Sequence, residues 1–216
     1  MSIVYPQESG SFSFDIKKNY WGSLFGSSEA LALIELAESN KGVVLYIARD
    51  IAHHDEIKKG LLFFNKSIEI LDFASWEVLA FDHFSPHPDI ISSRIHTLSK
   101  LLSIESAIVV TTIETLSQRL CPKDFIRKYS LNLKTRQNLE IDSFTESLIR
   151  IGYRRVTTVM EPGEFAIKGA LIDLYPMGAT NPFRIDLFDN EIDSIRSFDS
   201  STQRSIEVIE EIYLLP

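Results

Sequence analysis

The chain has 216 residues, of which 44% are hydrophobic and 24% are charged, a composition typical of a folded protein with one or two domains. It carries 22 lysine and arginine residues against 30 aspartate and glutamate residues, and the net charge of −8 excludes a chain-wide basic surface for nucleic acid. Cys121 is the only cysteine, which excludes an internal disulfide bond and a zinc site built on several cysteines.

The chain shows no sequence signal for a membrane or for export. No apolar run approaches the length of about 18 residues that a membrane-spanning helix needs. Residues 1–6 lack the basic start and apolar stretch of a secretory signal. We therefore expect a cytoplasmic protein with no membrane partner.

The first part of the chain alternates between helical and buried-strand patterns. Residues 43–48 and 107–111 are unbroken apolar runs, typical of strands buried on both faces of a parallel sheet, and a shorter strand is expected at 68–71. Apolar spacing and capping residues predict helices at 28–39, 50–62, 89–102 and 113–120. Strands that alternate with helices indicate an α/β fold with a parallel sheet.

The pattern changes after about residue 128. One amphipathic helix is predicted at 142–151, where Gly152 ends it. Residues 183–189 then alternate between apolar and polar positions, which is typical of an antiparallel strand with one wet face, and another strand follows at 192–198. We therefore predict two domains, an α/β domain over residues 1–128 and a smaller α+β domain with an antiparallel sheet over residues 129–216.

Residues 21–30 are the best candidate for a phosphate-binding P-loop. Their sequence, WGSLFGSSEA, supplies Gly22 and Gly26 and the hydroxyl groups of Ser27 and Ser28. The lysine that a P-loop needs is replaced by serine or glutamate, depending on the register, and a glutamate repels a triphosphate. We interpret the segment as a glycine turn that enters a helix, and we expect no cofactor in this chain.

The histidines do not form a metal-binding pattern. His53 and His54 are neighbours on a predicted helix, so their side chains point about 100° apart and do not chelate one ion together. His83 and His87 lie in a proline-containing loop with no third ligand in sight. The chain also lacks the Gly-x-Ser-x-Gly motif and a conspicuous cysteine–histidine pair. We therefore predict no metal site and no catalytic residue.

The polar face of the strand at 183–189 is a candidate interaction surface. Arg184 and Phe188 lie on the same face about 13 Å apart, opposite Phe183, Ile185 and Leu187. Arginine and aromatic residues are enriched at the energetic centres of interfaces. The alternative is that Phe188 packs under a second layer of the fold.

Several segments resemble bacterial transcription-repair coupling factors. The resemblance covers most of the chain from about residue 43 to residue 216. The segments that carry it read DHFSPHPDIISSR at 82–94, LSQRLCP at 116–122, GYR at 152–154, VMEPGEFA at 159–166, KGALIDLYPMG at 168–178 and PFRIDLFDNEIDSIRSFD at 182–199. Members of that family exceed a thousand residues, so the resemblance places this chain in their N-terminal region, which is similar to UvrB.

The resemblance implies a RecA-like first domain whose ATPase has decayed, followed by a second domain that binds UvrA. The UvrA contact positions of the family fall on Lys168, Arg184 and Phe188. The first of these is commonly arginine, and lysine keeps the charge but loses the bidentate fork. The resemblance assigns ATP, Mg²⁺, the DNA translocase motor and the contacts with RNA polymerase and double-stranded DNA to regions outside these 216 residues.

Two other functions stay open at this point. The first domain could still be a nucleotide-binding ATPase. The chain could also be a DNA-binding module with a basic patch around Lys134, Arg136, Arg154 and Arg155, whose binding would weaken steeply with salt. The net charge of −8 weighs against the DNA-binding function.

Overall fold

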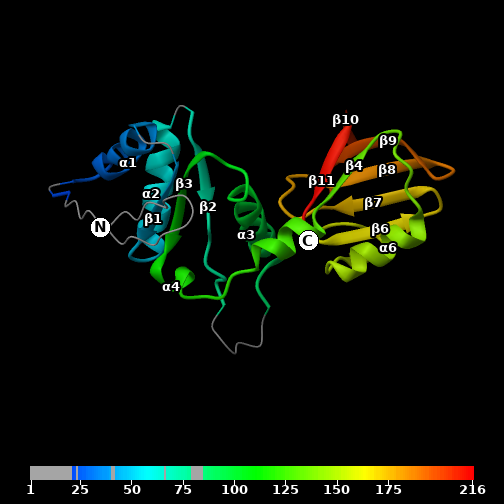
Figure 1. Cartoon of the computed structure of the whole chain (residues 1–216), viewed down its shortest axis with the longest axis horizontal. Helices are drawn as coiled ribbons and strands as arrows, with labels where there is room; N and C mark the ends of the chain where they lie inside the picture. Colours follow the sequence, from blue (N-terminus) through cyan, green and yellow to red (C-terminus); the bar gives the residue numbers. More distant parts are fainter. Residues whose placement is uncertain (1–20, 23, 40–41, 66, 79–84) are drawn as a thin grey trace. The chain divides into compact units, whose positions relative to one another are not determined.

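The computed structural model describes residues 21–22, 24–39, 42–65, 67–78 and 85–216, and the chain divides into two compact units (Figure 1). The first unit contains residues up to 77 together with 100–120, and the second contains 78–99 together with 121–216. Helix α3 (Pro88–Lys100) thus belongs, except for Lys100, to the second unit. It lies before the boundary predicted near residue 128, and independent folding of residues 129–216 stays a prediction.

The first unit contains a parallel sheet of three strands in the order β1-β3-β2. They are β1 (Gly42–Ala48), β2 (Glu69–Asp72) and β3 (Ser106–Thr112), and both outer strands run parallel to β3. Every residue of β3 after Ser106 is buried, as the unbroken apolar run at 107–111 predicts for a central strand. The α/β class predicted for this part of the chain is confirmed.

Helices α1 (Ser28–Ser39) and α2 (Ile51–Phe64) share one core with this sheet. The side chain of Asp50 caps α2 by accepting a hydrogen bond from the backbone N–H of His53 at 2.8 Å. Helix α4 (Ile113–Leu116) is shorter than predicted. It ends early because both the N–H and the hydroxyl of Ser117 donate to the Glu114 carbonyl, which closes a tight turn.

Helices α1 and α2 approach closely at Gly60, and this contact gives a prediction. A Cβ atom at Gly60 would lie 2.7 Å from the Cβ of Ala30. An exposed Gly→Ala substitution in a helix usually stabilises it by about 1 kcal/mol, but overpacking costs about 1–3 kcal/mol. We expect Gly60→Ala to lower the free energy of unfolding of the first unit by about 1 kcal/mol.

Unfolding followed by tryptophan fluorescence measures this change in stability, because Trp21 and Trp76 both belong to the first unit. The control is the same substitution in an Ala30→Gly background, where the clash is removed and Gly60→Ala should no longer destabilise. A gain in stability from Gly60→Ala alone contradicts the close contact.

The second unit is built on a six-stranded sheet in the order β10-β9-β8-β7-β6-β5. Every neighbouring pair is antiparallel except β5 and β6. The strands are β5 (Arg154–Arg155), β6 (Glu164–Lys168), β7 (Leu171–Tyr175), β8 (Phe183–Phe188), β9 (Glu191–Phe198) and β10 (Ser205–Ile209). The antiparallel sheet predicted after residue 128 is confirmed.

Two helices besides α3 and a short ladder complete the described part of this unit. They are α5 (Lys123–Tyr129), α6 (Ile141–Arg150) and the antiparallel pair β4 (Leu131–Lys134) and β11 (Glu211–Leu214). Phe144 and Leu148 of α6 are buried in one core with the inner sides of β6, β7, β8 and β9. Among the described residues, no helix is long and apolar enough to cross a membrane.

Candidate functional site

The alternation along β8 gives the six-stranded sheet two different faces. Ile185 and Leu187 are buried in the core under α6, together with Ile172 and Leu174 of β7. Arg184 and Phe188 therefore lie on the other face, which we call the outer face. A bulge in the pairing of β8 with β9 adds its extra residue, Asp193, to β9, so the alternation along β8 is unbroken.

A buried carboxylate holds Arg184 on the outer face. Asp173 of β7 lies directly opposite Arg184 in the strand register and is 2% exposed. Arg184 donates from Nε to Oδ1 of Asp173 at 2.6 Å and from Nη2 to Oδ2 at 3.0 Å. These hydrogen bonds raise the pKa of Arg184 above its usual value. The guanidinium is therefore locked as a cation in one orientation.

An aromatic ring supports the same guanidinium from a second direction. The central carbon of the Arg184 guanidinium lies 4.8 Å from the centre of the Phe198 ring, within cation–π range. Phe198 is fully buried with Val159 and Ala166 in a small cluster separate from the core under α6. The ring is thus a fixed platform, and only one fifth of the Arg184 side chain is exposed.

The other two predicted contact residues lie on the same face. Lys168 of β6 extends its Nζ to 3.9 Å from Oδ2 of Asp173, and half of its side chain is exposed. Phe188 is 75% exposed, so the alternative in which it packs under a second layer is wrong for the part of the chain that the structure describes. The structure brings Lys168 and Arg184 together around one carboxylate and leaves Phe188 free. Their part in binding stays a prediction.

Asp173 and its role in holding Arg184 are not predicted from the sequence. Its sequence context does carry a signal, because Asp173 alternates with Ile172 and Leu174 in a strand pattern. Its pairing with Arg184, however, depends on the register of two strands joined by the long connection 176–182, which alternation alone does not determine.

The candidate P-loop enters helix α1 through a glycine turn. Gly26 has a φ of +55°, Ser27 and Ser28 follow it, and α1 begins at Ser28. The turn and helix agree with the prediction for residues 26–30. Ser23 lies outside the described residues.

A polar cluster occupies the start of α1. The carboxylate of Glu29 accepts a hydrogen bond from the Tyr46 hydroxyl at 2.9 Å and lies 3.2 Å from Nε2 of His53. Tyr46 is 2% exposed, and its burial and the nearby Glu29 carboxylate raise the pKa of its phenol far above the usual value. The acidic group therefore stands near the position where a P-loop has its lysine, and it already has partners within the fold.

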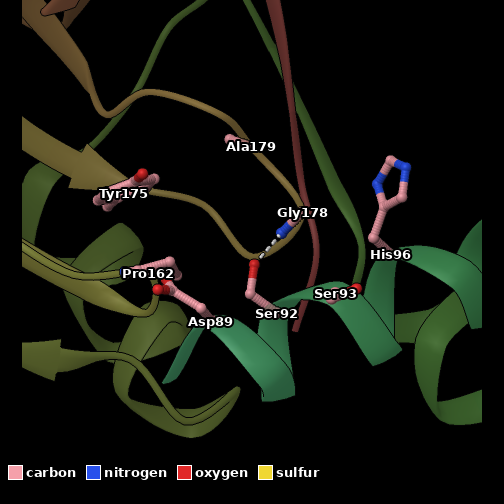
Figure 2. A pocket seen from close by; sticks show the side chains of 8 residues that line it. All are labelled: Asp89, Ser92, Ser93, His96, Pro162, Tyr175, Gly178 and Ala179. Carbon is pink, nitrogen blue, oxygen red and sulfur yellow. Dashed lines mark hydrogen bonds between the residues drawn. The ribbon is translucent and has the colours of Figure 1, made fainter. Parts of the chain in front are cut away.

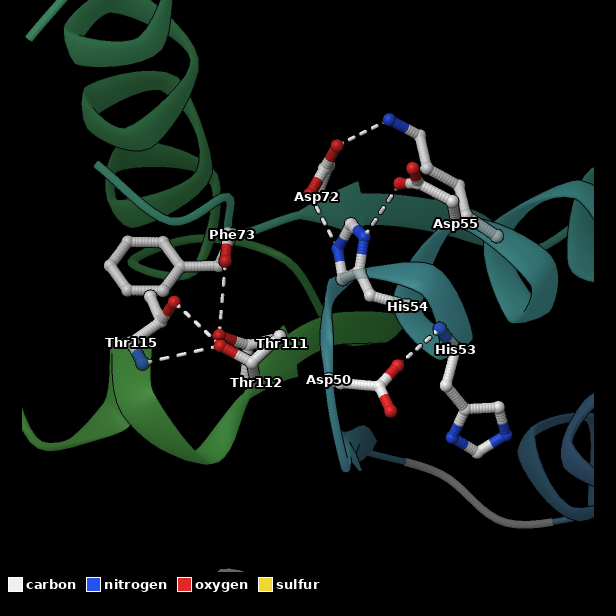
Figure 3. A network of polar contacts seen from close by, with 10 residues as sticks. Asp50, His53, His54, Asp55, Asp72, Phe73, Thr111, Thr112 and Thr115 are labelled. Carbon is white, nitrogen blue, oxygen red and sulfur yellow. Dashed lines mark hydrogen bonds and ion pairs between the residues drawn. The ribbon is translucent and has the colours of Figure 1, made fainter. Parts of the chain in front are cut away.

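His54 is the centre of a second polar network in the first unit, which Figure 3 shows. Nε2 of His54 lies 3.0 Å from Asp72 and Nδ1 lies 3.1 Å from Asp55, while Lys58 also pairs with Asp72. Only a doubly protonated imidazole donates from both nitrogens. The hydrogen bond to Asp72 accordingly raises the pKa of His54, although burial opposes the shift.

This network predicts a dependence of stability on pH. A raised pKa in the folded state means that the contribution of His54 is complete below its ordinary value of 6.5 and is lost as the pH rises through the folded pKa. Burial tends to raise the pKa of Asp72, but His54 and Lys58 hold it below 3.8, so the Asp72 contribution is lost in acid. The stability difference between wild type and His54→Gln should thus be largest between about pH 4 and pH 6.5.

Urea unfolding of both proteins from pH 4 to pH 9, followed by tryptophan fluorescence, measures that difference. His87→Gln is the control, because the His87 side chain is 61% exposed and its pair with Asp89 is a surface pair. A His54→Gln effect that stays constant across the range contradicts the charged network.

The basic residues considered for DNA binding are partly neutralised within the fold. Arg154 donates to Glu164 at 2.6 Å and lies 3.6 Å from Glu161. Lys134 pairs with Glu211 at 3.0 Å. These ion pairs weaken the basic patch that the DNA-binding alternative requires.

A cavity of about 290 Å³ lies within the second unit, between α3 and the loop after β7 (Figure 2). The hydroxyl of Ser92 accepts a hydrogen bond from the N–H of Gly178 at 2.7 Å and so links the two walls. The lining also includes Asp89, His96 and Tyr175. Within the described ranges, no three histidine, cysteine or acidic side chains gather to hold a metal ion, and His83 lies outside those ranges.

Comparison with known proteins places both units in one family. Residues 131–216 match the UvrB interaction domain family. The chain is 43% identical over 199 residues to the transcription-repair-coupling factor of Escherichia coli and 41% identical over 195 residues to that of Haemophilus influenzae. These alignments cover 90% of this chain and 17% of each relative.

A more distant relative shows the same extent of similarity. The transcription-repair-coupling factor of Bacillus subtilis is 29% identical over 201 residues, which cover 93% of this chain. The chain therefore spans about one sixth of the length of the curated relatives it matches. By sequence, the chain belongs to the transcription-repair coupling factors and corresponds to their N-terminal, UvrB-like region.

Proposed function

We propose that this chain binds UvrA through the outer face of its six-stranded sheet and so recruits nucleotide excision repair to stalled RNA polymerase. Lys168, Arg184 and Phe188 are the contact residues. The observation that carries the proposal is the placement of Phe188, which is 75% exposed on the same strand as the fixed cation of Arg184. A fixed arginine and an exposed aromatic ring on one face are residue types that interface hot spots favour.

Two further observations support this partner. The matching family model, UvrB interaction domain, covers residues 131–216 and therefore includes all three contact residues. The face is also built on strands rather than loops, which keeps its side chains in a fixed arrangement before binding and lowers the entropic cost of association.

Titration of UvrA with the purified chain tests the proposal. We expect saturable binding with a dissociation constant in the micromolar range or below, which corresponds to a binding free energy of about −8 kcal/mol or more favourable. Saturable binding that Phe188→Ala leaves unchanged contradicts the outer face as the docking site. Absence of saturable binding at about 100 μM of the chain contradicts the proposed function itself.

We also propose that the first unit is a RecA-like domain whose nucleotide site has decayed. The carboxylate of Glu29, engaged by Tyr46 and near His53 at the start of α1, supports the proposal because it disfavours a triphosphate at that position. Calorimetry with millimolar ATP and Mg²⁺ should show no saturable heat. A site with a dissociation constant below about 100 μM, roughly −5.5 kcal/mol, contradicts the decayed site and favours an ATPase.

The resemblance to transcription-repair coupling factors suggests the setting in which this chain works. We propose that it belongs to a cytoplasmic ATP-dependent DNA translocase. The motor, with its ATP and Mg²⁺, and the contacts with RNA polymerase and double-stranded DNA then lie in other regions of that protein. In this arrangement the present chain is a binding module and not an enzyme.

A further inference from the structure

The outer face contains one buried charge that the proposed contacts do not use. Asp173 is 2% exposed, so it has almost no surface to offer to a partner. It nevertheless contacts both basic residues of the proposed docking site, Arg184 through two hydrogen bonds and Lys168 at 3.9 Å. A buried carboxylate in contact with two more exposed cations points to a function in arranging them.

We propose that Asp173 is a positioning residue, which orients Arg184 so that its remaining donors meet one acidic side chain of the partner. This inference rests on the proposed function. Arginine has five N–H donors, and Asp173 takes two of them, from Nε and Nη2. The buried ring of Phe198 lies against the guanidinium. The donors left for a partner are therefore those of Nη1 and the second N–H of Nη2.

The backbone ladder sets the position of this pair. Asp173 and Arg184 are direct partners in the register of β7 and β8, so their separation depends on the sheet and not on a loop. Without Asp173, the long arginine side chain would regain rotamers that binding must then remove. Asp173 thus orients Arg184 before the partner arrives, which lowers the entropic cost of binding.

The charges of the cluster indicate the chemistry of the partner group. Two cations and one carboxylate leave a single net positive charge, while the neighbouring pair of Arg196 and Asp186 is neutral. The donors of Lys168 and Arg184 outnumber the acceptors of Asp173. One carboxylate of the partner matches this excess of donors and this single charge.

Asp173→Asn tests the proposal, because two physical effects predict opposite signs. If Asp173 acts only through its charge, removing it makes the face more positive, and an acidic partner should bind more tightly. If Asp173 positions Arg184, the substitution should weaken UvrA binding by about tenfold. Asp193→Asn, an exposed site on β9, is the matched control for the charge change and should alter the affinity by less than about twofold.

A double-mutant cycle with Arg184→Gln identifies the route by which Asp173 acts. If Asp173 works through Arg184, Asp173→Asn should have no further effect on UvrA affinity once Arg184 is glutamine. Losses that add up in the double mutant overturn the positioning role. Melting curves on the same samples show whether binding was measured on folded protein.

The outcomes separate this inference from the proposed function. Unchanged UvrA binding in Arg184→Gln shows that Arg184 is not a contact, which is a failure of the docking site itself. If Arg184→Gln weakens UvrA binding and Asp173→Asn does not, the positioning role is overturned and the docking site stays intact. An equal loss of affinity in Asp193→Asn shows that the effect is not specific to Asp173 and also overturns the positioning role.

If the Asp173→Asn variant does not fold, Arg184→Lys provides a second test of the positioning role. It keeps Asp173 paired with a cation but removes the fork that the two hydrogen bonds hold. We expect about a tenfold weaker UvrA affinity despite the conserved charge. Wild-type affinity in Arg184→Lys overturns the inference.

Discussion

Phe188→Ala should weaken the binding of UvrA by about 30-fold, which corresponds to about 2 kcal/mol. The ring is 75% exposed, so a partner can remove most of its apolar surface from water. The same exposure means that the fold does not depend on the ring, and the free energy of unfolding should change by only about 0.5 kcal/mol, as for ordinary surface substitutions. Titration of UvrA against both proteins measures the first effect and a melting curve the second.

Phe63 offers a matched control for this experiment. It is 80% exposed at the end of α2 in the first unit, whereas the outer face belongs to the second unit. Phe63→Ala removes the same ring from a similarly exposed site and should leave UvrA affinity unchanged. If Phe63→Ala and Phe188→Ala weaken binding equally, the loss is not specific to the outer face.

Arg184→Glu should lower the free energy of unfolding of the second unit by about 3 kcal/mol. The new carboxylate would face that of Asp173, which is 2% exposed and loses its bidentate partner. Breaking a buried ion pair from one side leaves a buried charge without compensation. The sequence places Arg184 on the polar face of its strand, and the structure adds the buried partner that makes its substitution costly.

Far-UV circular dichroism during urea unfolding measures this loss. Arg155→Glu provides the control, because it makes the same charge change at an exposed residue of β5 and should shift stability by only about 0.5 kcal/mol. Equal stability of Arg184→Glu and wild type contradicts the structural role of the pair. A further consequence is that Arg184→Glu is a poor test of binding, whereas Phe188→Ala leaves the fold intact.

The sequence predicts the two kinds of sheet because their hydrophobic patterns differ. Unbroken apolar runs at 43–48 and 107–111 identify β1 and β3, and the alternation at 183–189 identifies β8 together with its two faces. Both patterns are local and are set by which sides of a strand are buried. The same alternation places Phe188 on the outer face, and the structure shows that its ring is 75% exposed there.

Long-range partnerships account for what the sequence does not predict. Helix α3 groups with the second unit through contacts such as the hydrogen bond from Gly178 to Ser92, residues that lie 86 positions apart. The Glu29 side chain finds its partners Tyr46 and His53 across a strand and a helix. Periodicity carries no information about such pairs, because they depend on tertiary packing.

Site-specific photocrosslinking tests the central claim most directly. A benzoylphenylalanine residue would replace Phe188 in one sample and Phe63 in another, since both rings are exposed and the substitution keeps an aromatic side chain. We expect a crosslink to UvrA from position 188 and none from position 63. A chain that binds UvrA but crosslinks only from position 63, or from neither position, contradicts the outer face as the docking site.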